Sequence, residues 1–277
     1  NDFEVITFGS SAAVSSVVFV DTDDVDIGTS QSVNDFTVTA GGAVDDTSTI
    51  TVGGDLSVTT SAGNGAVTLD GLRVNGTIAL ATGNGAATVA NDVNLKFVTS
   101  TVGGALTATA TEGSISQGGS TVLTVTGNTS LTTSQSGKTI TLDQTNRFGL
   151  TGSGTLTLNT SGSTGDAIID NGITKLDMAA SSGGGDLTLT SGHADGIVDS
   201  GTVTVTGNLS LTNDVNNGNI TMGTLAVDGW IDLATSGSSS AVTVVNDFDL
   251  ILATSNMGGT FSCSYTWSTM SSWFICQ

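Results

Sequence analysis

The sequence predicts an all-β chain wound as a parallel β-helix, and three observations support this prediction. Two stretches echo each other, because residues 67–106 align with residues 220–261 after a two-residue insertion. Pairs of alternating, mostly apolar residues recur along the chain at intervals of a few tens of residues. The composition, with 38 glycines and no proline, favours strands and tight corners over helices. Repetition of this kind indicates a chain assembled from equivalent stacked units.

The echo is carried by identical residues at matched positions. Leu72 aligns with Leu225, Val74 with Val227, Asn91-Asp92 with Asn246-Asp247, Leu95 with Leu250 and Gly103-Gly104 with Gly258-Gly259. Within the first stretch, Asp70-Gly71 and Asn75-Gly76 interrupt the alternation, and each is suited to a sharp bend. We therefore expect roughly three short strands in each turn of a coil.

The recurrent pairs set the expected length of a coil. They are Leu56/Val58, Ile78/Leu80, Leu106/Ala108, Thr129/Leu131, Leu156/Leu158, Leu187/Leu189, Leu209/Leu211 and Ile231/Leu233. Their spacings of 22, 28, 23, 27, 31, 22 and 22 residues average 25, which predicts about 10–11 coils of roughly 25 residues. Antiparallel hairpins in a sandwich or barrel are the alternative, but hairpins give no reason for the long period.

The first 32 residues are expected to form an N-terminal cap or docking segment ahead of the repeats at 33–259. They contain the densest acidic cluster of the chain, formed by Asp21, Asp23, Asp24 and Asp26. Carboxylates grouped in this way can bind calcium, because hard divalent cations prefer oxygen ligands. The competing interpretation is a solvated strand face, with Val25 and Ile27 on the buried side.

Residues 260–277 depart from the repeat pattern and are expected to form an aromatic C-terminal cap. Cys263 and Cys276 are the two cysteines of the chain, and their proximity favours a disulfide that closes a short terminal loop, with two free thiols as the alternative. The nearby aromatic residues either cover the end of the core or dock another copy. They are Phe261, Tyr265, Trp267, Trp273 and Phe274.

Charge and hydropathy restrict the class of partner. A formal net charge of -20 repels phosphate backbones and anionic lipid surfaces, so binding to nucleic acid is not expected. No apolar run reaches the length of about 20 residues that a transmembrane helix needs. The chain begins at Asn1 without an initiator methionine, which fits a mature exported product.

Catalytic chemistry has few candidates. His193 is the only histidine and lies in a loop-like stretch, and no nucleophile motif accompanies it. The basic residues are scattered singly along the chain, at Arg73, Lys96, Lys138, Arg147 and Lys175. No catalytic residue and no cofactor other than calcium is predicted, and an enzymatic role is not expected.

Several segments resemble the repeats of filamentous haemagglutinin-like exoproteins and autotransporter adhesins of bacterial cell surfaces. They are GSISQGGSTVLTVTGNTSLTT (113–133), GTLTLNTSG (154–162), GDLTLTS (185–191) and GNLSLTN (207–213), and the likeness covers about residues 33–260. The resemblance implies a right-handed parallel β-helix, export to the cell surface and a structural or adhesive role. The chain departs from those families in its shortness and in its terminal cysteine pair, which favours a processed fragment or a self-assembling subunit.

Three functions follow from these features. The first is an extracellular structural subunit that joins other copies of itself through its ends into a fibre, sheath or layer. The second is an adhesin whose side loops bind surface glycans or matrix proteins, with candidate loops at 161–166, 181–185 and 214–218. The third is ice binding through the recurrent Thr-x-Thr pairs, although their uneven spacing disfavours a flat threonine lattice.

Overall fold

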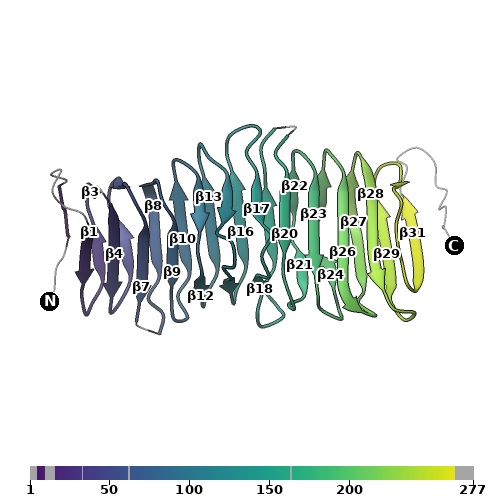
Figure 1. Cartoon of the computed structure of the whole chain (residues 1–277), viewed down its shortest axis with the longest axis horizontal. Helices are drawn as coiled ribbons and strands as arrows, with labels where there is room; N and C mark the ends of the chain where they lie inside the picture. The colour runs from purple at the N-terminus through teal and green to yellow at the C-terminus, as the bar shows by residue number, and fades with distance from the viewer. Residues whose placement is uncertain (1–4, 10–15, 33, 62, 163, 266–277) are drawn as a thin grey trace.

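The protein is a rod of parallel strands stacked along one axis, with its two ends at opposite extremes of the rod (Figure 1). The computed structural model describes residues 5–9, 16–32, 34–61, 63–162 and 164–265. The described residues form strands, turns and bends but no helix, and every strand pairing among them is parallel. Consequently none of the described segments is a helix that could span a bilayer. The antiparallel alternative is excluded for this part of the chain.

The described strands belong to two sheets. The first contains β1 (Ser16–Val20), β4 (Asp35–Ala40), β7 (Leu56–Thr60), β9 (Ile78–Ala81), β11 (Leu95–Phe97), β12 (Ser100–Val102), β14 (Ile115–Gln117), β15 (Leu123–Val125), β17 (Ile140–Leu142), β18 (Arg147–Phe148), β20 (Ala167–Asp170), β23 (Leu187–Ser191), β26 (Leu209–Asn216), β28 (Trp230–Ser236) and β30 (Ile251–Leu252). The second contains β2 (Val25–Ile27), β3 (Ser30–Ser32), β5 (Val44–Asp46), β6 (Ile50–Val52), β8 (Val67–Val74), β10 (Ala87–Asn91), β13 (Leu106–Ala110), β16 (Thr129–Thr133), β19 (Leu156–Asn159), β21 (Leu176–Met178), β22 (Ser181–Gly183), β24 (Ile197–Asp199), β25 (Val203–Val205), β27 (Ile220–Val227), β29 (Ala241–Asn246) and β31 (Thr260–Tyr265).

The chain makes about 11 turns of roughly 22 residues, so the number of coils is as predicted and each coil is shorter than predicted. Leu56 pairs with Ile78, and Ile78 pairs with Phe97, which is 19 residues further on. The sequence prediction had placed Leu106 after Ile78, but Leu106 lies on β13 in the other sheet. The spacings of 28 and 31 residues cross from the first sheet to the second and back, so one coil too few was counted and the average rose to 25. At about 4.8 Å per coil, the rod is about 50 Å long.

The core is the inside of the coil, filled by the inward side chains of both sheets. All sixteen residues of the predicted apolar pairs are buried, from Leu56 and Val58 through to Ile231 and Leu233. The predicted bend is also present, because Val67 and Leu69 precede it and Leu72 and Val74 follow it, all four buried. Every second residue of a strand therefore faces inward, as expected from the period of two in a strand.

Short side chains with hydrogen-bonding groups tie each coil to the next at the bends. Asn91, which is 1% exposed, accepts a bond from the N–H of Val74 at 2.7 Å and donates to the carbonyl of Val74 at 3.0 Å, although these residues lie on successive coils. The carboxylate of Asp46 accepts the N–H groups of Asp70 and Gly71 at 3.1 and 2.7 Å. These bonds satisfy backbone groups that the bend removes from the strand ladder.

Both predicted terminal segments contribute strands to the solenoid. In residues 1–32, β1, β2 and β3 pair in parallel with β4, β5 and β6, so the ladder begins in the segment expected to be a cap. In residues 260–277, β31 pairs in parallel with β29. The first coil, built from β1, β2 and β3, also has the expected three strands per turn.

Candidate interaction surfaces

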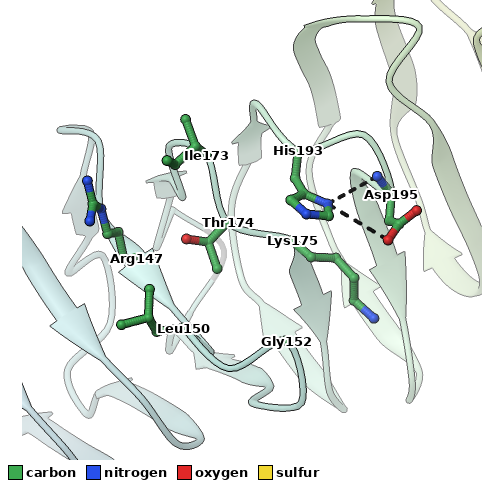
Figure 2. A pocket seen from close by; sticks show the side chains of 8 residues that line it. All are labelled: Arg147, Leu150, Gly152, Ile173, Thr174, Lys175, His193 and Asp195. Atoms are coloured by element: carbon green, nitrogen blue, oxygen red, sulfur yellow. Dashed lines mark hydrogen bonds and ion pairs between the residues drawn. The ribbon is translucent and has the colours of Figure 1, made fainter.

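One flank of the rod carries a cavity of about 310 Å³ lined by side chains from three successive coils. In Figure 2, Arg147 and Leu150 stand on one side, His193 and Asp195 on the other, and Ile173 and Thr174 lie between them. Lys175 and Gly152 complete the lining. Three of the six Lys, Arg and His residues of the whole chain therefore meet at one place.

Two glycines shape the loop that forms one wall of the cavity. Gly149 and Gly152 have φ angles of 68° and 80°, a left-handed conformation that costs other residues energy. The N–H of Gly152 donates to the carbonyl of Gly149 at 2.7 Å, which closes a tight turn directly after β18. The turn directs Leu150 outward, where its side chain is 47% exposed.

Two fully buried polar side chains hold the three coils in register beneath the cavity. Asn171 accepts the N–H of Phe148 at 2.7 Å and donates to the carbonyl of Thr174 at 3.2 Å. Ser191 donates to that same carbonyl at 3.1 Å and accepts the N–H of His193 at 3.3 Å. Both Asn171 and Ser191 are 0% exposed. The walls are thus fixed relative to one another by bonds shielded from water.

The charged groups of the cavity differ in their partners. Lys175 lies 3.4 Å from Asp177, and the Nδ1 atom of His193 lies 4.0 Å from Asp195. The backbone N–H of Asp195 donates to Nδ1 at 3.1 Å, so the neutral imidazole carries its proton on Nε2. Arg147 is exposed and makes no ion pair with any residue that the structure describes.

The carboxylate of Asp170 stands at the end of β20, three residues before Ile173 of the cavity lining. Partial burial raises the pKa of Asp170 above its ordinary value. The N–H of Gly172, which donates to this carboxylate at 2.7 Å, opposes that shift, and the charges of Asp214 and Asp143 add to it. The charges of Asp143 and Asp214 are thus close enough to Asp170 to act on its carboxylate.

Arg147, Lys175 and His193 are scattered along the sequence, and the structure brings them together. Each lies in or directly after the same corner of its coil, and Asn146, Asn171 and Ser191 open these corners. The intervals from Asn146 to Asn171 and from Asn171 to Ser191 are 25 and 20 residues, so no single coil length shows this alignment. The loops proposed for adhesion at 181–185 and 214–218 are partly strand, since they overlap β22 and β26.

The four aspartates proposed for calcium lie close in sequence but differ in environment. Asp21 is 4% exposed, whereas Asp23 and Asp24 are exposed and Asp26 is half-buried on β2. Asp24 accepts the N–H of Ala43 at 2.6 Å. No group of three or more His, Cys, Asp or Glu side chains that could hold a metal ion occurs among the described residues. The calcium site remains a prediction without geometric support.

The residues predicted for the C-terminal cap are only partly described. Cys263 is buried on β31, and Phe261 packs against the core. Tyr265 ends β31, while Cys276 and the three remaining aromatic residues, Trp267, Trp273 and Phe274, lie outside the described residues. The disulfide and the aromatic docking surface therefore stay predictions.

Large hydrophobic side chains are exposed mainly near the two ends of the rod. Of the ten in the described part of the chain, seven lie before or in the first coil or in the last two coils. The seven are Val5, Val18, Val20, Trp230, Phe248, Ile251 and Leu252. The other three, Leu150, Ile168 and Ile173, lie in the middle of the rod, and two of them line the cavity.

The fold and its regular ladder define a β-solenoid repeat protein. A family model described as "Repeats of unknown function (DUF5649)" matches residues 13–81 and 84–155, just over half of the chain, and the chain belongs to this repeat family. Each match spans about three coils of roughly 22 residues. Comparisons with curated proteins and with solved structures give no match.

Proposed function

We propose that this protein is an extracellular structural β-solenoid that joins other copies of itself through its end coils into a fibre, sheath or surface layer. The main observation in support of this proposal is that exposed large hydrophobic side chains are concentrated near both ends of the described rod. Val18 and Val20 are 71% and 59% exposed on β1, and Ile251 is 54% exposed on β30. Surfaces of this kind favour association with another protein surface.

The pairing of the end strands supports the same proposal. Among the described strands, β1 pairs with β4 alone and β31 with β29 alone, so each leaves one edge without a described partner. Edge strands offer backbone groups to which a further strand can add. Addition of a coil from another copy would continue the ladder that already runs through the molecule.

The resemblance to filamentous haemagglutinin-like and autotransporter adhesin repeats supports a location on a bacterial cell surface. The strongly acidic composition fits assembly through the ends. A net charge of -20 makes the flanks of individual rods repel one another. On this proposal the ends attract through apolar contact while the sides repel. The expected role is mechanical rather than enzymatic.

Sedimentation velocity and negative-stain microscopy of the purified chain over a range of concentrations test this proposal. We expect end-to-end oligomers in the unmodified protein and monomers in the double variant Val18→Asp/Ile251→Asp, because a charge in each end contact opposes association. Ile168→Asp is the matched control, since Ile168 is also exposed but lies mid-rod, and it should assemble normally. Monomeric rods at every concentration would overturn the proposal.

An adhesin is the alternative function, and the flank cavity is the observation in its favour. The cavity lies away from both ends and combines a cation with exposed aliphatic side chains. Its candidate ligands include acidic glycans and matrix proteins. This function predicts binding that does not depend on assembly.

A further inference from the structure

We propose that the flank cavity binds a small carboxylate that carries an aliphatic group. This inference goes beyond the proposed structural role and does not depend on it. The cavity volume of about 310 Å³ is close to the lower limit of known small-molecule sites. It suits a ligand of the size of an acylated amino acid or one sugar unit.

The guanidinium of Arg147 supplies the recognition of the carboxylate. Arg147 has no described ion-pair partner, although the chain contains 25 acidic residues. A guanidinium presents paired donors that match the two oxygens of a carboxylate, and such bonds are stronger than those between neutral groups. By contrast, Asp177 already compensates Lys175, and Asp195 lies beside His193.

The exposed side chains next to Arg147 supply the recognition of the aliphatic group. Leu150 is 47% exposed and Ile173 is 70% exposed, yet both line the same cavity. Figure 2 shows them above and below the space beside Arg147. Covering these side chains with an aliphatic group would remove apolar surface from water. The Nε2–H of His193 adds a donor on the opposite wall.

The frame of the cavity is suited to binding because it is rigid. The buried Asn171 links the strand of Arg147 to the loop of Thr174, and the buried Ser191 links that loop to His193. Side chains on a fixed frame lose little freedom when a ligand arrives. The same polar residues stabilise coil stacking, whereas Arg147 and Ile173 supply the recognition of the ligand.

The test is a titration of the full chain with N-acetyl-leucine, followed through the backbone amide signals of residues 147–152, 173–175 and 193–195. We expect saturable shifts confined to these residues. N-acetyl-leucinamide, which lacks the charge, and acetate, which lacks the aliphatic group, should each bind at least about tenfold more weakly. Glucuronate is the comparison with an acidic sugar, which has the carboxylate but no aliphatic group, so tighter binding of glucuronate than of N-acetyl-leucine would overturn the aliphatic part of the proposal.

Two variants and one control separate recognition from folding. Arg147→Gln should weaken N-acetyl-leucine binding by about tenfold or more, because charge-assisted hydrogen bonds contribute strongly. Ile173→Ser should weaken it about threefold to tenfold. Arg73→Gln is the matched control, because Arg73 is exposed elsewhere and pairs with Asp92 at 2.9 Å, and it should bind as the unmodified protein does.

Three results would overturn the proposal. They are the absence of saturable shifts, equal binding of N-acetyl-leucine and its amide, and unchanged binding by Arg147→Gln with its amide spectrum intact. A change in the sedimentation coefficient of Arg147→Gln without ligand would also count against it. That outcome would assign Arg147 to a contact between copies, and the end variants would then show whether the end contacts persist.

Discussion

The two echoed regions of the chain, one in the interior of the rod and one at its C-terminal end, use the same bonds. Asn91 bonds to the N–H and carbonyl of Val74 and to the carbonyl of Asn94. Asn246 bonds in the same way to Val227 and to the carbonyl of Asp249. The register shift between β8 and β10 recurs between β27 and β29. The sequence echo is therefore a repeated bend with a fixed set of hydrogen bonds.

The regions differ in how far the same pattern is buried. Leu95 and Phe97 are 0% exposed in the interior region, whereas the aligned Leu250 is half-buried and Leu252 is 37% exposed. Both pairs follow the same bend, and the strands that they belong to or adjoin, β11 and β30, lie in the same sheet. The difference arises because the interior coil is covered by strands on both sides, while β30 pairs with β28 alone in the described chain. Burial in this fold is a property of neighbouring coils, as in other repeat proteins.

The largest effect is expected from truncating the aligned leucines. Leu95→Ala should lower the free energy of unfolding by about 2 to 5 kcal/mol, because it leaves a cavity in a fully enclosed core. Leu250→Ala should cost less than about 1.5 kcal/mol, since this side chain is only half-buried. Urea unfolding followed by circular dichroism measures both. Equal losses would show that position along the rod does not control burial.

The shared asparagine bond set should give matched effects in the two regions. Asn91→Ala and Asn246→Ala each leave backbone groups of the bend without a partner, so each should cost about 1 to 3 kcal/mol. Asn84→Ala is the control, because Asn84 is exposed and its change should stay within about 0.5 kcal/mol. The same urea experiment applies. A large loss at one asparagine alone would contradict the structural equivalence of the bends.

The smallest effect concerns a charge present in one region only. Burial raises the pKa of Asp46, the N–H groups of Gly71 and Asp70 oppose the shift, and the charge of Asp70 adds to it. The position aligned with Asp70 is the uncharged Gly223. Asp70→Asn should therefore lower the pKa of Asp46 towards its ordinary value, which carboxyl ¹³C NMR can follow. An unchanged pKa would remove Asp70 as a cause.

The sign of the accompanying stability change follows from linkage. Because the pKa of Asp46 is raised in the folded protein, its charged form costs stability at neutral pH, and the cost disappears as the pH falls below the ordinary value of 3.8. Asp70→Asn removes part of this cost. We expect slight stabilisation at pH 7 and none from this source at pH 3. Stabilisation that persists undiminished at pH 3 would point to another cause.

The fold class could be predicted from the sequence because inward and outward side chains alternate within each strand. The alternation identified Val67, Leu69, Leu72 and Val74 as buried on both sides of the bend, and all four are buried. The coil length could not be fixed in the same way. Inward residues of the two sheets look alike in sequence, so Ile78 was linked to Leu106 instead of Phe97.

The cavity was missed because its residues come from three coils whose loops differ in length. Arg147, Lys175 and His193 stand 28 and 18 residues apart, and neither interval equals a coil. The buried Asn146, Asn171 and Ser191 mark the shared corner, and their burial depends on the register between coils. Local sequence patterns report which side chains face inward, whereas a flank site depends on the stacking of distant loops.

The stacking of parallel coils is tested most directly by distances between spin labels on one outward ladder. Labels carried by a non-natural amino acid at Lys96 and at Thr188, Ser210 or Asp232 are four, five and six coils apart in the first sheet. Electron–electron double resonance should give distances that rise in steps, at about 19, 24 and 29 Å. Distances that fail to increase along this series would contradict the solenoid and the functions inferred from it.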